Sequence, residues 1–221
     1  AVTGNDDGQA ILTQLEQANL FLIPLDDERR WYRYHHLFAD LLRMQLEQTQ
    51  PGQAPALHRR ASEWYESKGQ IVEAVGHALL AGDVEWIEHL VAGNALAVIY
   101  HGELATVASW LDALPEAVMR SRPRLCVAQA WTLAYAGQFD GIEPLLHDAE
   151  KALAGPGEHS ATPVLSTVEG QHIAGHIAAI RAYVAALKGD ISHAAELARE
   201  ALDCLPEVDL TVRGWTALVL G

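Results

Sequence analysis

Hydrophobic and polar residues recur at helical spacing along almost the whole chain, with one exception near the amino terminus. Residues 9–18 carry an apolar stripe on one face, which predicts a short amphipathic helix. The members of that stripe are Ile11, Leu12, Leu15 and Ala18. The pattern then changes to an apolar run, LFLIPL, a polar stretch, DDERR, and an aromatic run, WYRY. Residues 20–34 are therefore predicted to form a β-hairpin.

A second helix and a turn follow the hairpin. Pro24 has no backbone N–H for a strand ladder, which makes the first strand an edge strand. Apolar residues then return to helical spacing, which predicts a helix over about 35–47. The segment TQPGQAP at 49–55 is expected to be a turn or linker. This order of helix, hairpin and helix matches the second half of a winged-helix unit.

The remaining chain is predicted to be entirely helical, and a short phrase repeats at its turns. A glycine, a polar residue and an apolar residue follow one another at Gly69, Gly82, Gly102, Gly137 and Gly189. A glycine in the left-handed C-cap of one helix, just before the start of the next, is typical of stacked helical hairpins.

The phrases at Gly137 and Gly189 are the most alike. Apolar or small residues follow both glycines at eight, nine and twelve positions, and the twelfth is Ala149 or Ala201. Alanine there permits close helix packing. The pattern resembles tetratricopeptide repeats, although the glycine spacing is irregular and AGPGEHSATP at 154–163 inserts a loop.

Composition bounds the class of protein. Half of the 221 residues are hydrophobic, enough for a core, but no stretch has the ~18 consecutive apolar residues of a membrane span. The two cysteines fit a reducing compartment and the amino end has no signal-peptide pattern, so we expect a cytoplasmic protein. A formal net charge of −14 opposes phosphate backbones, so no direct nucleic-acid contact is predicted. The chain lacks an initial Met and ends within a predicted helix, and we expect an excerpt of a longer protein.

The segment HIAGH is the strongest candidate for metal binding, because it places His172 and His176 four residues apart on one helix face. It lacks the glutamate of zinc peptidases, and spacing fixes no third ligand. Glu169, His159 or His193 could serve only by assumption. Two histidines on a helix surface explain the motif without a metal, so we predict no metal site. A zinc enzyme that uses this pair is an alternative.

Other chemical signals are weak. The chain shows no phosphate-binding loop, nucleophile elbow or paired-carboxylate motif, and no catalytic residue is predicted. The acidic cluster at 26–28 is expected to be a solvated turn. Arg29, Arg30 and Arg33 are compatible with a DNA-reading wing, but the acidic chain favours surface or interface charge. Aromatic residues of the helical part are expected to fill the core, with a minority on a concave surface.

Three segments, in order, carry a resemblance to a known family. They are NLFLIPLDDERRWYRYHHLFADLLR, LHRRASEWYESKGQIVEAVGHALLAGD and LPEAVMRSRPRLCVAQAWTLAYAGQFDGIEPLL. The chain resembles the middle of the large ATP-binding LuxR-type transcription regulators (MalT-like, signal-transduction ATPase class). In that family an ATPase module precedes the winged helix, a helical arm and a tetratricopeptide-like superhelix follow, and a LuxR-type DNA-binding domain ends the chain.

The resemblance implies a fold and a domain division. We expect an all-α chain, a tetratricopeptide-like helical-repeat superhelix preceded by a partial winged-helix unit with one β-hairpin. Residues 1–50 would be the C-terminal half of the winged-helix domain, residues 51–115 the helical arm, and residues 116–221 the first repeats of the sensor domain.

The resemblance also implies a role for one histidine of YHHLF. Related ATPases place a histidine at the start of the last winged-helix helix, where it approaches the β-phosphate of bound ADP in the resting state. His35 matches that position and His36 falls on a variable one. An imidazole and a helix amino terminus both suit an anion. A histidine that caps its helix or packs against Tyr34 is the structural alternative.

The function implied by the resemblance is regulatory and not enzymatic. This segment would relay nucleotide and inducer state to a DNA-binding domain, with ATP or ADP bound elsewhere in the full-length protein and no cofactor in this segment. Its partners would be the flanking modules of the same chain, a small-molecule inducer of unknown identity, and further copies upon activation; no membrane is expected. The alternative is a helical-repeat adaptor for protein partners without nucleotide coupling.

Overall fold

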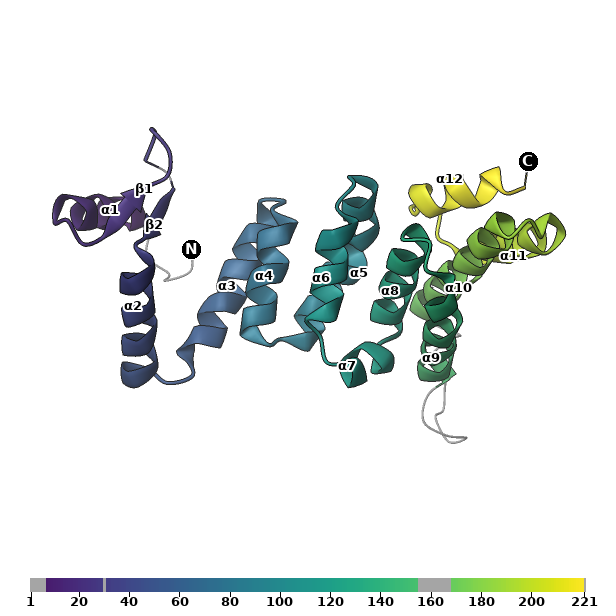
Figure 1. Ribbon diagram of the computed structural model, residues 1–221, viewed down its shortest axis with the longest axis horizontal. Coiled ribbons are helices and arrows are strands. Elements are labelled where there is room, and N and C mark those ends of the chain that lie inside the picture. The colour runs from purple at the N-terminus through teal and green to yellow at the C-terminus, as the bar shows by residue number, and fades with distance from the viewer. Residues whose placement is uncertain (1–6, 30, 155–167, 221) are drawn as a thin grey trace. The chain divides into compact units, whose positions relative to one another are not determined.

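The computed structural model describes residues 7–29, 31–154 and 168–220. Its elements confirm the predicted fold class, because one two-stranded sheet accompanies helices throughout the described part (Figure 1). The chain divides into two compact units, Ala1–Asp83 and Val84–Gly221. That boundary lies inside the predicted arm at 51–115, and the predicted three-part division stays a prediction.

The first unit opens with the helix, hairpin and helix that the sequence predicts. Helix α1 covers Gly8–Gln17, strands β1 and β2 cover Leu22–Pro24 and Tyr32–Tyr34, and helix α2 covers His36–Thr49. The strands are antiparallel and pair Pro24 with Tyr32, which places the proline in an edge strand as predicted.

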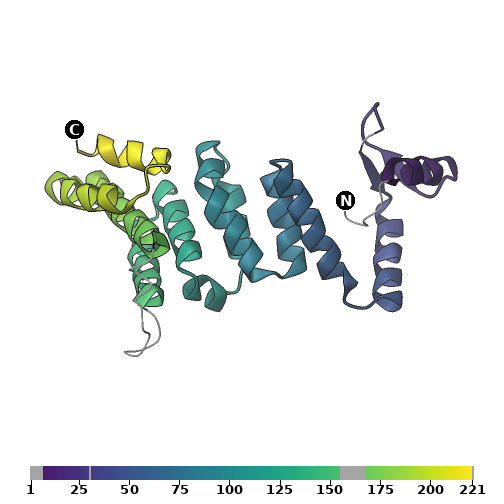
Figure 2. The ribbon, with the colours of Figure 1, turned by 180° about the vertical axis from the view of Figure 1, so that it is seen from behind.

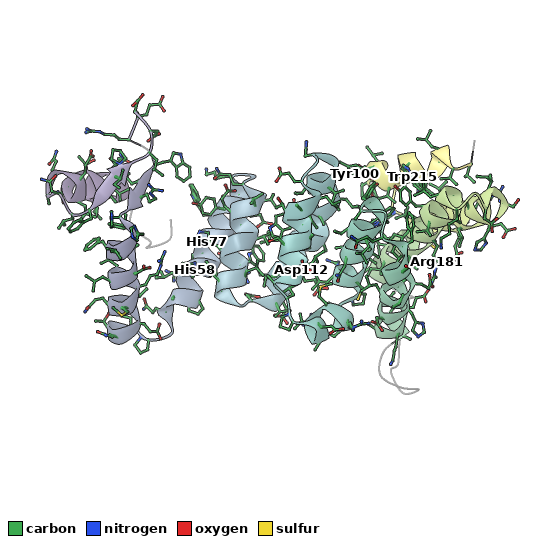
Figure 3. All side chains as sticks on the ribbon, in the orientation of Figure 1. His58, His77, Tyr100, Asp112, Arg181 and Trp215 are labelled. Carbon is green, nitrogen blue, oxygen red and sulfur yellow. The ribbon has the colours of Figure 1, made fainter. Side chains whose placement is uncertain are left out.

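Two antiparallel helices complete the first unit. Helix α3 covers Gln53–Ser67 and helix α4 covers Ile71–Ala81. The predicted turn at 49–55 is too long, because Pro55 lies within the first turn of α3, where a missing N–H costs no helical hydrogen bond. Figure 3 shows His58 and His77 on these neighbouring helices, and their Nδ1 atoms lie 2.9 Å apart.

The second unit is a series of helices packed on their sequence neighbours (Figures 1 and 2). These elements are α5 (Val84–Tyr100), α6 (Leu104–Asp112), α7 (Glu116–Ser121), α8 (Pro123–Tyr135), the 3-10 turn η1 (Phe139–Gly141), α9 (Ile142–Ala154), α10 (Val168–Leu187), α11 (Ile191–Cys204) and α12 (Leu210–Leu218). Helices α8 with α9 and α10 with α11 form the two pairs predicted from Gly137 and Gly189. The predicted loop at 154–163 falls, apart from Ala154, outside the described residues.

The glycine phrases predict the turns correctly. All five glycines have positive φ angles between 68° and 86°, a conformation that costs other residues energy. The two alanines at the twelfth position, Ala149 and Ala201, are fully buried. Small residues at these places therefore let neighbouring helices approach, as the repeat pattern requires.

A buried cluster of the second unit lies among α8, α9, α10, α11 and the start of α12. It centres on Trp131, which is 1% exposed, with Leu146 and Ile180 fully buried around it. Tyr135 stacks against the same indole, and the ring of Tyr183 contacts it at a tilt of 57°. The expectation that aromatic residues of the helical part fill the core is confirmed for Trp131 and for Trp110, which is 5% exposed, whereas Tyr135 is half-buried. The packing holds the face of α10 that carries HIAGH against α8.

Candidate functional site

The two histidines of HIAGH converge on one point of α10. His172 and His176 are one helical turn apart, so their side chains project from the same face. Their Nε2 atoms lie 3.1 Å from each other. The side chain of His176 is 12% exposed and that of His172 is 43% exposed. The pair thus has one buried and one accessible imidazole.

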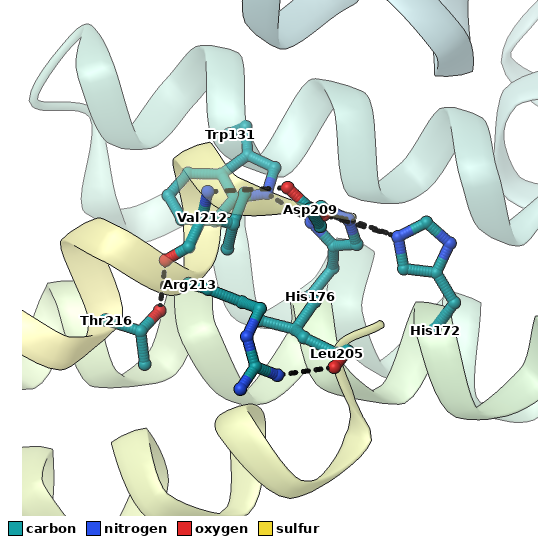
Figure 4. A network of polar contacts seen from close by, with 8 residues as sticks. All are labelled: Trp131, His172, His176, Leu205, Asp209, Val212, Arg213 and Thr216. Carbon is teal, nitrogen blue, oxygen red and sulfur yellow. Dashed lines mark hydrogen bonds and ion pairs between the residues drawn. The ribbon is translucent and has the colours of Figure 1, made fainter. Parts of the chain in front are cut away.

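Asp209 supplies a carboxylate to this pair from the residue before α12. Its Oδ2 atom lies 3.0 Å from Nε2 of His176 and 3.3 Å from Nε2 of His172 (Figure 4). Its Oδ1 atom accepts the backbone N–H of Val212 at 3.4 Å and so caps the first turn of α12. One oxygen therefore starts a helix while the other faces both imidazoles.

The environment keeps Asp209 ionised. Burial tends to raise the pKa of its carboxyl group, but the hydrogen bonds from His172 and His176 outweigh burial. The pKa of Asp209 is therefore held well below its usual range.

Trp131 of α8 fixes the proton on His176. Its indole Nε1–H donates to Nδ1 of His176 at 3.1 Å. Because an indole N–H can only donate, Nδ1 of His176 must be unprotonated in this arrangement. A neutral His176 then carries its proton on Nε2 and donates it to Asp209.

Arg213 secures α12 beside this cluster. Its Nη1 donates to the backbone oxygens of Leu202 and Leu205, at 2.8 and 2.6 Å. Both carbonyls lie at the end of α11, where helix carbonyls lack intrahelical partners. The position of Asp209 is thus set by contacts on both sides of the connection between α11 and α12.

A cavity of about 290 Å³ adjoins the histidines. It is lined by residues of α5, α8 and α10, among them Trp131, His172, His176 and Arg124. Arg124 pairs with Glu169 at 2.9 Å. The volume of the cavity is close to the lower limit of the range for small-ligand pockets. The cavity lining is mainly apolar with a few polar groups.

The sequence identified the two histidines but not their acidic partner. Among the ligands considered there, Glu169 pairs with Arg124, His193 lies near Glu196, and His159 falls outside the described residues. Asp209 is 37 residues from His172. Its one sequence signal is that of an N-cap, an Asp directly before a helix.

His35 belongs to the first unit, whereas the histidine and aspartate cluster belongs to the second. It is the exposed residue immediately before α2, and its side chain makes no capping hydrogen bond. Its backbone N–H donates to the carbonyl of Phe21, which ties it to the hairpin. Its ring lies against that of His36, with centroids 4.4 Å apart. The capping alternative for His35 is therefore not supported.

Comparison with known proteins places this chain. It is 33% identical over 205 residues to HTH-type transcriptional regulator MalT of Yersinia pestis (strain Pestoides F), an alignment that covers 93% of this chain. The MalT protein of Cronobacter sakazakii (strain ATCC BAA-894) gives the same identity and coverage of this chain. Residues 1–54 match the family model of the MalT winged helix domain. The chain is thus similar to the MalT regulators along most of its own length.

The relationship to MalT confirms the predicted resemblance and limits its scope. The chain spans about a fifth of the length of these MalT relatives, 22% and 21%. The matched MalT domain is a winged helix and not a catalytic domain. No solved structure matches this chain. In the part of the chain that the structure describes, no helix is both long and apolar enough to cross a membrane.

Proposed function

We propose that this chain is the signal-coupling and sensor segment of an ATP-dependent, LuxR-type transcription regulator. The observation that carries the proposal is its continuous similarity to MalT over 93% of its length, from the winged helix into the helical repeats. The segment itself would carry out no catalysis. An upstream ATPase module would bind ATP or ADP, and a downstream domain would bind DNA.

The coupling uses two places in the chain. His35 would sense the nucleotide, since it is exposed and stands at the amino terminus of α2, where backbone N–H groups favour an anion. A small-molecule inducer would bind among the helices of the second unit, where the cavity beside Trp131 offers a mainly apolar wall with polar groups.

Signal transfer would follow from a change in populations. If ADP favours a closed state and inducer favours an open one, each ligand shifts the same equilibrium according to its difference in affinity for the two states. The open state would self-associate and bring DNA-binding domains to a promoter. These roles, like a cytoplasmic location, are part of the proposal.

The proposal is tested by ADP binding to the full-length regulator that contains this segment. The His35→Ala variant should bind ADP about tenfold more weakly, the scale expected for a lost hydrogen bond to a charged group. It should also activate transcription at lower inducer concentration. His36→Ala is the matched control, because His36 is exposed and adjacent but falls on the variable position. Equal ADP affinity in wild type and His35→Ala would favour the adaptor alternative.

A further inference from the structure

We propose that His172, His176 and Asp209 bind a divalent transition metal, with Zn²⁺ the best fit, and that the ion fastens the start of α12 to α10. The sequence-based expectation of no metal depended on a missing third ligand. Asp209 provides that ligand, and nothing in the proposed regulatory function requires this site. The proposal therefore stands or fails independently of nucleotide sensing.

The donor atoms have the spacing that zinc requires. The three separations between His172 Nε2, His176 Nε2 and Asp209 Oδ2 are 3.0, 3.1 and 3.3 Å. Ligand atoms about 2.0–2.1 Å from a tetrahedral zinc ion lie about 3.3–3.4 Å apart. The three atoms thus form one face of a slightly compressed tetrahedron, and small side-chain rotations suffice to bind an ion.

The donor types select the metal. Two imidazoles and one carboxylate form a ligand set that occurs in zinc sites, whereas Ca²⁺ and Mg²⁺ prefer oxygen ligands. Three protein ligands leave a fourth position for water or another molecule. Because both histidines also line the cavity, a molecule in the cavity and the ion would share two side chains.

Asp209 can serve the metal without losing its structural task. Its Oδ1 caps α12 through the N–H of Val212, while Oδ2 faces the imidazoles. A metal on Oδ2 therefore leaves the helix cap in place. It adds a bond between α10 and the residue that begins α12, and so should reduce opening of this terminal helix.

Metal binding must rearrange the contact with Trp131. A neutral imidazole that binds metal through Nε2 carries its proton on Nδ1. Nδ1 of His176 cannot then accept the indole N–H that it receives in the described state. The metal-bound and Trp131-bonded states of His176 therefore exclude one another, and Trp131 should report on the ion.

The experiment titrates the purified 221-residue chain, first stripped with a chelator, with Zn²⁺ in a calorimeter. We expect one ion per chain with a Kd below about 1 μM. Asp209→Asn should weaken binding at least about 100-fold, because it removes the anionic ligand while Asn still caps the helix. Co²⁺ in place of Zn²⁺ should give the visible absorption of a tetrahedral site.

The matched control is Asp190→Asn. Asp190 caps α11 through its Oδ1, which accepts the N–H of His193, just as Asp209 caps α12. This variant should bind Zn²⁺ like the wild type. Zinc should also protect the amides of α12 from hydrogen exchange in the wild type and in Asp190→Asn, but not in Asp209→Asn.

Trp131→Phe gives a second and independent readout. This variant has no indole N–H to displace, so it should bind Zn²⁺ severalfold more tightly than the wild type, the scale of one neutral hydrogen bond. It should also lose the zinc-induced change in tryptophan fluorescence. The proposal is overturned if zinc binds no more tightly than about 100 μM, or if Asp209→Asn and Asp190→Asn bind it equally.

Discussion

Gly175 lies in α10 between the two histidines, at a point where the helix meets Leu205. A Cβ atom added there would lie 2.9 Å from Cγ of Leu205 and 3.0 Å from its backbone nitrogen. A backbone atom cannot move aside as a flexible side chain does. The close approach of the connection between α11 and α12 to α10 therefore depends on glycine.

Gly175→Ala should destabilise the second unit by roughly 1–3 kcal/mol, because overpacking outweighs the gain in helix propensity. Gly214→Ala is the control in the same unit. Gly214 is exposed within α12, and its added Cβ would meet no atom within 4 Å. That variant should gain roughly 0.5–1 kcal/mol. Chemical unfolding measures both, and a stabilised Gly175→Ala would contradict the described packing.

The site shows why the sequence predicts the two histidines but not Asp209. His172 and His176 are one turn apart on one helix, so local periodicity alone brings them together. Asp209 joins them from the connection between α11 and α12, and its approach depends on Gly175, on the turn at Leu205 and on Arg213. No local sequence pattern encodes that combination. The sequence around Asp209 indicates only that this residue caps a helix.

Between elements, the contact of α3 with α4 contains a pair of histidines. Nδ1 of His58 lies 2.9 Å from Nδ1 of His77, and Tyr65 stacks on the ring of His77. Burial, together with Arg43, lowers the pKa of His58. Burial and the neighbouring His58 lower the pKa of His77. The folded state therefore favours neutral rings.

This pair should make the first unit less stable in mild acid. The unfolded chain takes up protons near pH 6.5, before the folded chain does, so the free energy of unfolding should fall as the pH drops below about 6.5. Urea unfolding of the chain at pH 7.5 and pH 5.5 measures the difference. Replacement of both histidines by glutamine should reduce the pH dependence of the free energy of unfolding of the first unit. An unchanged slope would show that other groups cause it.

The turns between elements were more predictable than the ends of the helices. A glycine followed by a polar and an apolar residue marks a local backbone state, and all five predicted glycines adopt positive φ. Proline is ambiguous by comparison, since it is accepted both in a linker and in the first helical turn. Pro55 therefore looked like part of a linker although α3 begins at Gln53.

At the scale of the whole molecule, the second unit contains its own core. Every residue of the buried cluster around Trp131 lies between Cys126 and Val212. Arg181 adds ion pairs from α10 to Glu143 and Glu150 of α9, each with a contact at 2.5 Å. This cluster and these ion pairs therefore include no residue before Val84.

A chain of residues 84–221 should be helical and unfold cooperatively when produced alone. Circular dichroism during thermal unfolding tests the expectation, with the 221-residue chain as the reference. The transition of the shorter chain should match one transition of the longer chain within a few degrees. A shorter chain without a cooperative transition would show that the first unit is required for folding.

The two oxygens of Asp209 have an evolutionary consequence. Asn or Ser at this position can still start α12, because both are good caps, but neither supplies an anionic ligand. A lineage could therefore discard ion binding by one substitution and keep its architecture. Helix α12 and ion binding can therefore be conserved separately. Relatives with Asp at this position would keep both, whereas relatives with Asn or Ser would keep only the helix.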